Sequence, residues 1–247
     1  MKLLFKTTMV EWKINLRNFV NVFFSLIFPV MMMLLFGSIY GNDPSQYYGG
    51  HGSVDTSTAG YICMVISVSG LMTLPITLSQ YRERKILKRF MATPIRPFDI
   101  LVSQLIVNAI VSLMGTVLLI AIGILVFDLK FFGNVLEVIA AMLLITLSIF
   151  SLGLFIAGVT KNAKSALAIS YVVYFPMLFL SGATLPLQFM PEAIVTASKF
   201  LPLTYGVELL QGLWLGGSMG DYLLPIGVLS GLFVLFGGIS LMVFKWE

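Results

Sequence analysis

Six long apolar stretches constrain this chain more than any other feature of its sequence. Each is about 20 residues or longer, which is the length that a helix needs to cross the hydrocarbon core of a bilayer. The predicted spans are residues 20–40, 58–81, 100–127, 134–159, 165–184 and 222–244. Backbone polar groups in lipid must bond within their own helix unless a β-barrel closes, and the sequence has no strand-like alternation. We therefore predict one all-α integral membrane domain, residues 1–247, with six transmembrane helices.

Positively charged residues are distributed unevenly among the connections. Of the 15 Lys and Arg residues, 13 lie before the first span, between the second and third, between the fourth and fifth, or after the last. Because such residues in short loops stay on the cytoplasmic side, both termini are predicted in the cytoplasm. The expected location of the protein is the plasma membrane. Charged residues make up only 11% of the chain, against about 25% in soluble domains, which excludes a water-soluble fold. The net charge of +4 thus indicates orientation in the lipid bilayer, and no nucleic-acid partner is expected.

Three segments outside the spans have a predicted arrangement. The N-terminal arm, residues 1–19, is amphipathic and is expected to form an interfacial helix on the cytoplasmic surface. Residues 185–221 are too apolar for a free loop and too rich in proline for one span, so two short external re-entrant helices are predicted, separated near Leu201 and Pro202. They would either cap an outward pathway or act as a structural lid. The connection after residue 127 is short, so the third and fourth spans are expected to form a tight antiparallel pair.

The connection between the second and third spans is strongly basic. From Arg82 to Arg96 it reads RERKILKRFMATPIR. As a helix it would have a basic face and an apolar face, and Pro94 and Pro97 would end it. The apolar face would comprise Ile86, Leu87, Phe90 and Met91. Such a helix either rests on lipid headgroups or inserts its apolar face into a groove of a partner protein.

Catalytic and ligand-binding motifs are missing from the sequence. It has no G-x-x-x-x-G-K-[ST] phosphate loop for ATP. Glu137 is the nearest approach to a membrane carboxylate, but it lies within one turn of the external end of its span and is expected to face water. The single cysteine, Cys63, and the single histidine, His51, provide neither a disulfide nor a metal site. We therefore predict no catalytic residue, no metal and no cofactor on this chain.

The spans instead carry Phe and Met residues at helical spacing, in a set that also includes one serine. The candidates for a substrate pathway are Phe24, Phe28 and Met32 in the first span, Met64, Ser67 and Met72 in the second, and Phe175 and Phe179 in the fifth. Phe and Met side chains adapt to varied apolar ligands, although ordinary helix packing is the alternative. Pro29, Pro75 and Pro176 lie in the same three spans, and each is expected to kink its helix.

Two stretches of the sequence have a familiar pattern in this layout. The first is RERKILKRFMATPIRP after the second span, and the second is LSGATLPLQFMP followed by LPLTYGVELLQG before the last span. With the amphipathic arm and the six spans, they resemble the permease subunits of type-2 ABC exporters, and within that family the drug-efflux branch. The resemblance covers essentially the whole chain. The chain departs from the family pattern at Lys85 and Ile86, where the family often has Gly-Thr.

The resemblance implies how the chain would receive energy. In that family the basic helix after the second span is a coupling helix that docks on a separate ATPase, which places the helix at residues 83–93 here. Carried over by position, the implied coupling residues are Glu83, Arg84, Leu87, Lys88, Phe90, Thr93 and Pro94. The N-terminal arm would correspond to the family's connecting helix, which also contacts the ATPase.

The resemblance further implies an assembly and a cargo. Two ATP-binding cassette subunits, which bind ATP and magnesium, would act on two permease chains, either two copies of this one or two related chains. The first, second and fifth spans would face a route between the permeases for a hydrophobic or amphiphilic compound, such as an antibiotic, another drug or a lipid. A non-transporting membrane scaffold remains the alternative. A passive channel is disfavoured, because ions need a polar lining.

Overall fold

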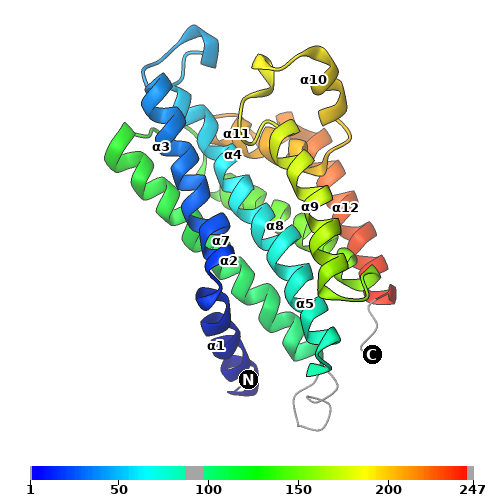
Figure 1. The fold of residues 1–247 in the computed structure, drawn as a ribbon. Coiled ribbons are helices and arrows are strands. Elements are labelled where there is room, and N and C mark those ends of the chain that lie inside the picture. Colours follow the sequence, from blue (N-terminus) through cyan, green and yellow to red (C-terminus); the bar gives the residue numbers. More distant parts are fainter. Residues whose placement is uncertain (1, 87–96, 244–247) are drawn as a thin grey trace.

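The computed structural model describes residues 2–86 and 97–243, and this part of the chain is almost entirely helical (Figure 1). The helices, with π- and 3₁₀-helical segments written η, are α1 (Lys2–Arg17), α2 (Phe19–Val22), η1 (Phe23–Ile27), α3 (Phe28–Tyr40), η2 (Gln46–Tyr48), α4 (Ser53–Ser67), η3 (Val68–Thr73), α5 (Leu74–Glu83), α7 (Pro97–Phe127), α8 (Val135–Val159), α9 (Ala163–Leu180), η4 (Leu187–Phe189), α10 (Glu192–Ser198), α11 (Pro202–Trp214), η5 (Met219–Tyr222) and α12 (Leu223–Val243).

Six candidate membrane spans lie in the described residues, which confirms the predicted number. They are Phe19–Tyr40, Gln46–Glu83, Asp99–Phe127, Val135–Val159, Ala163–Leu180 and Met219–Met242. The spans run alternately up and down the bundle. α1, the end of α5 and the start of α7 therefore lie at one end, here termed the α1 end, and α10 lies at the other, termed the α10 end (Figure 1).

The second span, from α4 to α5, forms the centre of the bundle. α4 packs against α3, α7 and α11, while α5 packs against α8 and α9. Ile62, Cys63 and Met64 are fully buried. Close packing depends on glycine where the span crosses α8, because a Cβ on Gly153 would lie 1.9 Å from the carbonyl oxygen of Gly70. Small residues at such crossings let helix backbones approach in membrane proteins.

The prediction that the third and fourth spans pack as a tight pair is wrong. Within the described residues α7 and α8 make almost no direct contact, although a short connection joins them at the α10 end. α7 packs against α4, whereas α8 packs against η3 and, most extensively, against α12. A short connection brings only two helix ends together, and the glycine crossing draws the rest of α8 to the second span.

Widened π-helical turns interrupt the first two spans just before their prolines. η1 ends at Ile27, two residues before Pro29, and η3 ends at Thr73, two residues before Pro75. Proline has no N–H to donate and its ring clashes with the preceding turn, so the hydrogen-bond ladder changes register there. The two widened turns contact each other in the bundle. Pro176, by contrast, lies inside α9, which is α-helical throughout.

A buried carboxylate organises the α10 end. Asp55 is 2% exposed and accepts hydrogen bonds from Asn42 Nδ2 at 2.9 Å, from the N–H of Lys130 at 2.9 Å and from the N–H of Gly52 at 3.4 Å. Asn42 also donates to the carbonyl of Phe127 at 3.0 Å. The three hydrogen bonds offset the free-energy cost of removing the carboxylate of Asp55 from water. They join the end of α3 and the start of α4 to the connection that follows α7.

Two short helices complete the α10 end. α10 and α11 are bent by 97° relative to each other, with the break between Ser198 and Pro202. Glu137, at the start of α8, is half-buried and accepts a hydrogen bond from the N–H of Met219 at 2.9 Å. The carboxylate that was expected to face water therefore ties α8 to η5.

Candidate functional site

Most of the predicted coupling helix lies outside the described part of the chain. This applies to Leu87, Lys88, Phe90, Thr93 and Pro94. Both ends of the basic segment are described: α5 extends through Glu83, Arg84 and Lys85 form a turn, and α7 begins at Pro97. The residues that hold these two ends at the α1 end of the bundle are the part of the candidate site that the structure defines.

Arg82 joins α5 to the end of α8. Its guanidinium donates to the carbonyl oxygens of Ala157 and Thr160, each at 2.7 Å. Carbonyls in the last turn of a helix have no partner within it, and the helix dipole favours a cation there. Ser79, one turn earlier on α5, is hydrogen-bonded to the hydroxyl of Thr160 at 2.9 Å. Two residues of α5 therefore hold the end of α8.

Glu83 joins the same helix to the start of α9. Its Oε2 accepts a hydrogen bond from the N–H of Ala163, the first residue of α9, at 2.9 Å. The first N–H groups of a helix lack partners, and its dipole favours an anion there. Glu83 and Arg84 are exposed, and their contact with an ATPase stays a prediction.

Tyr81 joins α5 to α1. Its hydroxyl donates to Glu11 Oε2 at 2.5 Å, and Gln104 Nε2 of α7 donates to the same oxygen at 2.5 Å. Glu11 is 5% exposed. Burial raises the pKa of Glu11 above its ordinary value, while the two hydrogen bonds act in the opposite direction by stabilising the carboxylate. One carboxylate oxygen thus connects three helices.

α1 packs against α7 through its polar face. Thr7, Glu11 and Asn15 recur every four residues and are buried, whereas Phe5 and Met9 are 67% and 45% exposed. On a soluble protein, the apolar face of a surface helix packs inward and its polar face meets water, so the arrangement of α1 is the reverse. It fits a helix whose apolar face meets lipid and whose polar residues face the bundle.

The turn after α5 contains a lysine in the left-handed conformation. Lys85 has φ 55°, and its N–H donates to the carbonyl of Arg82 at 2.9 Å. A side chain with a Cβ is strained there, whereas glycine is not. The departure from the Gly-Thr pattern therefore places a strained residue in this turn.

The eight predicted pathway residues occupy three environments. Those of the second span are buried in the core: Met64, Ser67 and Met72. Those of the first span are partly buried against that core: Phe24, Phe28 and Met32. Those of α9 are exposed at the surface: Phe175 and Phe179. None of the eight lines any of the cavities of about 570, 350, 230 and 200 Å³, and the pathway stays a prediction.

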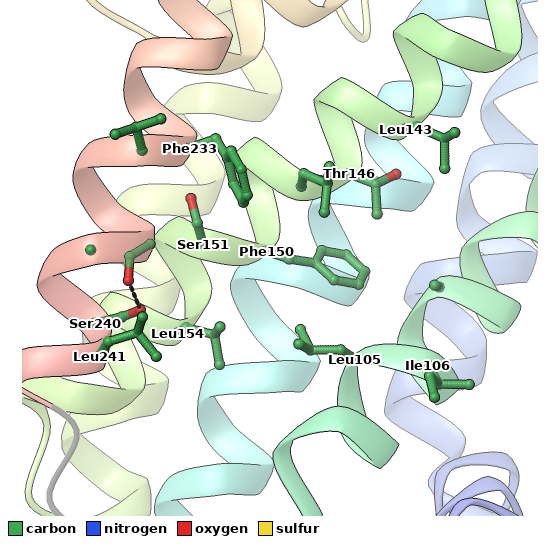
Figure 2. Close-up of a pocket in the computed structure, with 15 residues that line it drawn as sticks. Leu105, Ile106, Leu143, Thr146, Phe150, Ser151, Leu154, Phe233, Ser240 and Leu241 are labelled. Atoms are coloured by element: carbon green, nitrogen blue, oxygen red, sulfur yellow. Dashed lines mark hydrogen bonds between the residues drawn. The ribbon is translucent and has the colours of Figure 1, made fainter. Parts of the chain in front are cut away.

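The cavity of about 570 Å³ lies between α7, α8 and α12, with Leu105 and Phe233 on opposite sides (Figure 2). Its hydroxyl groups bond to their own helices: Thr146, Ser151 and Ser240 donate to backbone carbonyls at 2.7, 2.7 and 2.9 Å. The lining is therefore apolar in character and suits hydrocarbon chains. The cavity of about 350 Å³ continues the same separation between α7 and α8.

Comparison with known families identifies the family of this chain. The family described as ABC-2 type transporter matches residues 3–215. That range includes five of the six spans and both ends of the basic segment. The chain belongs to the ABC-2 type transporter family. It is accordingly a multi-span permease chain, of a family that works with ATP-binding cassette partners.

Three curated relatives of this ABC-2 type permease illustrate the range of similar proteins. The chain is 27% identical over 184 residues to ABC transporter G family member 20 of Dictyostelium discoideum, covering 73% of this chain and 24% of the relative. It is 22% identical over 188 residues to the probable multidrug ABC transporter permease YbhS of Escherichia coli (strain K12), covering 76% and 49%. It is 25% identical over 185 residues to the putative transport permease ycf38 of Porphyra purpurea, covering 74% and 64%. The matched part is less than two thirds of each relative.

Sequence reasoning missed several of the residues that hold α5 in this ABC-2 type permease. Glu11, Tyr81 and Gln104 were not among the candidate residues, and Arg82 was noted only for its charge. A signal was present in the sequence, because Glu11 is the one acidic residue in a basic arm and belongs to a polar stripe with a spacing of four. The arm was interpreted from its apolar stripe alone, as an interfacial helix.

Proposed function

We propose that this chain is the permease subunit of an ATP-driven exporter, which moves a hydrophobic or amphiphilic compound such as a drug, an antibiotic or a lipid out of the cytoplasm or the inner leaflet. The observation that carries the proposal is the attachment of α5. Tyr81, Arg82 and Glu83 bind three other elements immediately before the basic segment. A basic segment that only rests on lipid headgroups does not require the helix before it to be bound to other helices. A segment that transmits force does require such a network of fixed contacts.

The assembly would contain two permease chains and two ATP-binding cassette subunits, with ATP and magnesium on the latter. The α1 end would face the cytoplasm of a cell that carries the protein in its plasma membrane, because most Lys and Arg residues belong to connections at that end. The ATPases would dock there on residues 83–93, through Glu83, Arg84 and the residues that follow.

ATP binding would bring the two ATPases together and displace the basic segments. Each α5 would move with the elements bound to it, namely α1 and the α8–α9 connection. The route between the permeases, lined by the Phe and Met residues of the first, second and fifth spans, would then change from inward-open to outward-open. The widened turns η1 and η3 would supply places for the first two spans to bend during this change, because π-helical turns interrupt the regular hydrogen-bond ladder.

Purification of the tagged chain from its native membrane tests the proposal. Mass spectrometry of the complex is expected to find an ATPase with a phosphate loop, whose activity depends on this chain. Vesicles that contain the complex should accumulate a hydrophobic cargo only when ATP is supplied. Recovery of an intact complex without an ATPase would contradict the proposal and favour the scaffold.

A further inference from the structure

We propose that Glu11 is a positioning residue for energy coupling, through which movement of the basic segment reaches α1. The inference rests on the proposed function, since it concerns how the permease responds to its ATPase. It assigns a role to a buried acidic side chain that lies outside the predicted coupling and pathway residues.

Both ends of the basic segment converge on one atom of Glu11. Tyr81 lies two residues before the end of α5, and Gln104 lies seven residues after the start of α7. Their side chains donate to the same carboxylate oxygen. A displacement of the segment acts on α5 and α7 together, and both helices are bound to α1 at that point.

The burial of Glu11 indicates a role beyond holding the fold together. Removing a carboxylate from water is costly, and apolar residues of similar size often stabilise a protein as well or better. Glu11 is nevertheless 5% exposed, and both of its hydrogen bonds go to other helices. Hydrogen bonds are directional, so bonds to two helices at once specify a single arrangement of α1. Apolar packing specifies the arrangement of a helix less strictly.

The position of α1 makes this link suitable for transmission. The hydroxyl of Thr8 donates to that of Ser103 on α7 at 3.3 Å, so the neighbouring turn of α1 is held to the same helix. The apolar face of α1 is exposed, as at Phe5 and Met9. The helix is therefore free to move along the lipid surface while its polar face follows α5 and α7.

The test measures cargo transported per ATP hydrolysed, in vesicles that contain the permease and its co-purified ATPase. Glu11→Ala is expected to lower this ratio at least about fivefold, the lower end of typical coupling between sites, while the complex still assembles and hydrolyses ATP. Glu11→Gln keeps an acceptor oxygen and should stay close to the unmodified complex. Asn15→Ala, one turn along the same buried face, is the matched control and should leave the ratio unchanged.

A cross-link separates positioning from any other role of the carboxylate. Thr8→Cys and Ser103→Cys, introduced together, allow a disulfide to hold α1 on α7. In the Glu11→Ala background, oxidation should restore much of the lost ratio, and reduction should remove it again. Cys63 is fully buried and does not interfere.

The outcomes distinguish this inference from the proposed function. An unmodified complex without ATP-driven transport counts against the proposed function. Transport by the unmodified complex, with an unchanged ratio in Glu11→Ala, overturns the role of Glu11 alone. If Glu11→Ala does not assemble, Tyr81→Phe carries the test, because it removes one of the two hydrogen bonds and keeps the buried ring. An unchanged ratio in Tyr81→Phe then overturns the role.

Discussion

Lys85 occupies a left-handed turn directly after the side chains that anchor α5. Its neighbour Arg84 has ordinary backbone angles, with φ −80° and ψ 4°. The sequence comparison with the family pattern identified Lys85 as a departure, yet it did not reveal that the residue at this position needs a positive φ. Backbone conformation at a single turn depends on the elements that the turn joins, and composition contains little information about it.

Lys85→Gly is expected to stabilise the permease by about 0.5–1 kcal/mol. Relief of a strained left-handed residue, worth roughly 1–2 kcal/mol, is partly offset by the larger conformational entropy of glycine in the unfolded chain. Thermal unfolding in detergent measures the effect. Arg84→Gly is the matched control and should destabilise, since no strain is relieved there. A loss of stability in both variants would contradict the assigned turn.

Glu11 gives the stability of the permease a dependence on pH. Its pKa in the folded protein lies above the ordinary value of 4.5 because of burial. Between these two values the folded state binds more protons than the unfolded state, so the free energy of unfolding falls as pH rises. The difference in unfolding temperature between the unmodified protein and Glu11→Gln, which does not titrate, should therefore decrease as pH rises from 4.5. A difference that increases over this window would show that the pKa is lowered.

The sequence was sufficient to predict the individual spans, but it was not sufficient to predict which spans pack against each other. The six spans follow from the length of their apolar stretches, a requirement of the bilayer that does not depend on tertiary contacts. The expected pairing of α7 with α8 failed because loop length does not determine which faces pack. The partner of α8 is set in part by Gly70 and Gly153, whose meeting cannot be recognised from two single glycines in separate spans.

Gly153→Ala is expected to destabilise the fold strongly. The new Cβ would lie 1.9 Å from the carbonyl oxygen of Gly70, which is backbone and cannot rotate away. Overpacking of this kind typically costs about 1–3 kcal/mol. Gly231→Ala in α12 is the control, since nothing lies within 4 Å of that Cβ position in the chain. The yield and unfolding temperature of the two variants should differ clearly, and equal values would contradict the crossing.

Arg82 is expected to matter more for coupling than Arg84. Arg82→Ala removes two bonds between α5 and the end of α8, and each bond to a charged group is typically worth about 1.5–3 kcal/mol. Arg84→Ala removes the same charge from the exposed neighbouring position. Transport per ATP hydrolysed should fall further in the Arg82 variant than in the Arg84 variant, which loses only one side chain of the proposed docking surface. The reverse order would favour direct docking of Arg84 over the attachment of α5.

At the scale of the whole molecule, composition and charge gave the class of protein, and the exposed faces indicate how copies would meet. The predicted pathway residues of α9 lie on the surface, where they would face either lipid or a route between two permeases. Val172, on α9, is 73% exposed, and Leu125, on α7, is 84% exposed. The sequence could not separate lipid-facing from partner-facing positions, because both are apolar.

A cysteine introduced at Val172 should cross-link two permease chains if the fifth spans face each other. Leu125→Cys is the matched control on an outer helix and should remain monomeric under the same oxidation. Denaturing gel electrophoresis of native membranes gives the result. Cross-linking at Leu125 but not at Val172 would place the contact between permeases on the other side of the bundle.

The three anchors at the end of α5 have a mechanical consequence. Successive residues of a helix project about 100° apart around its axis, so Tyr81, Arg82 and Glu83 reach outward in three directions. A twist of α5 in either sense would stretch all three attachments at once, whereas a tilt that carries the attached elements along would stretch none. The end of the second span should therefore resist rotation about its own axis. A force applied to α5 at the α1 end would instead tilt the whole helix.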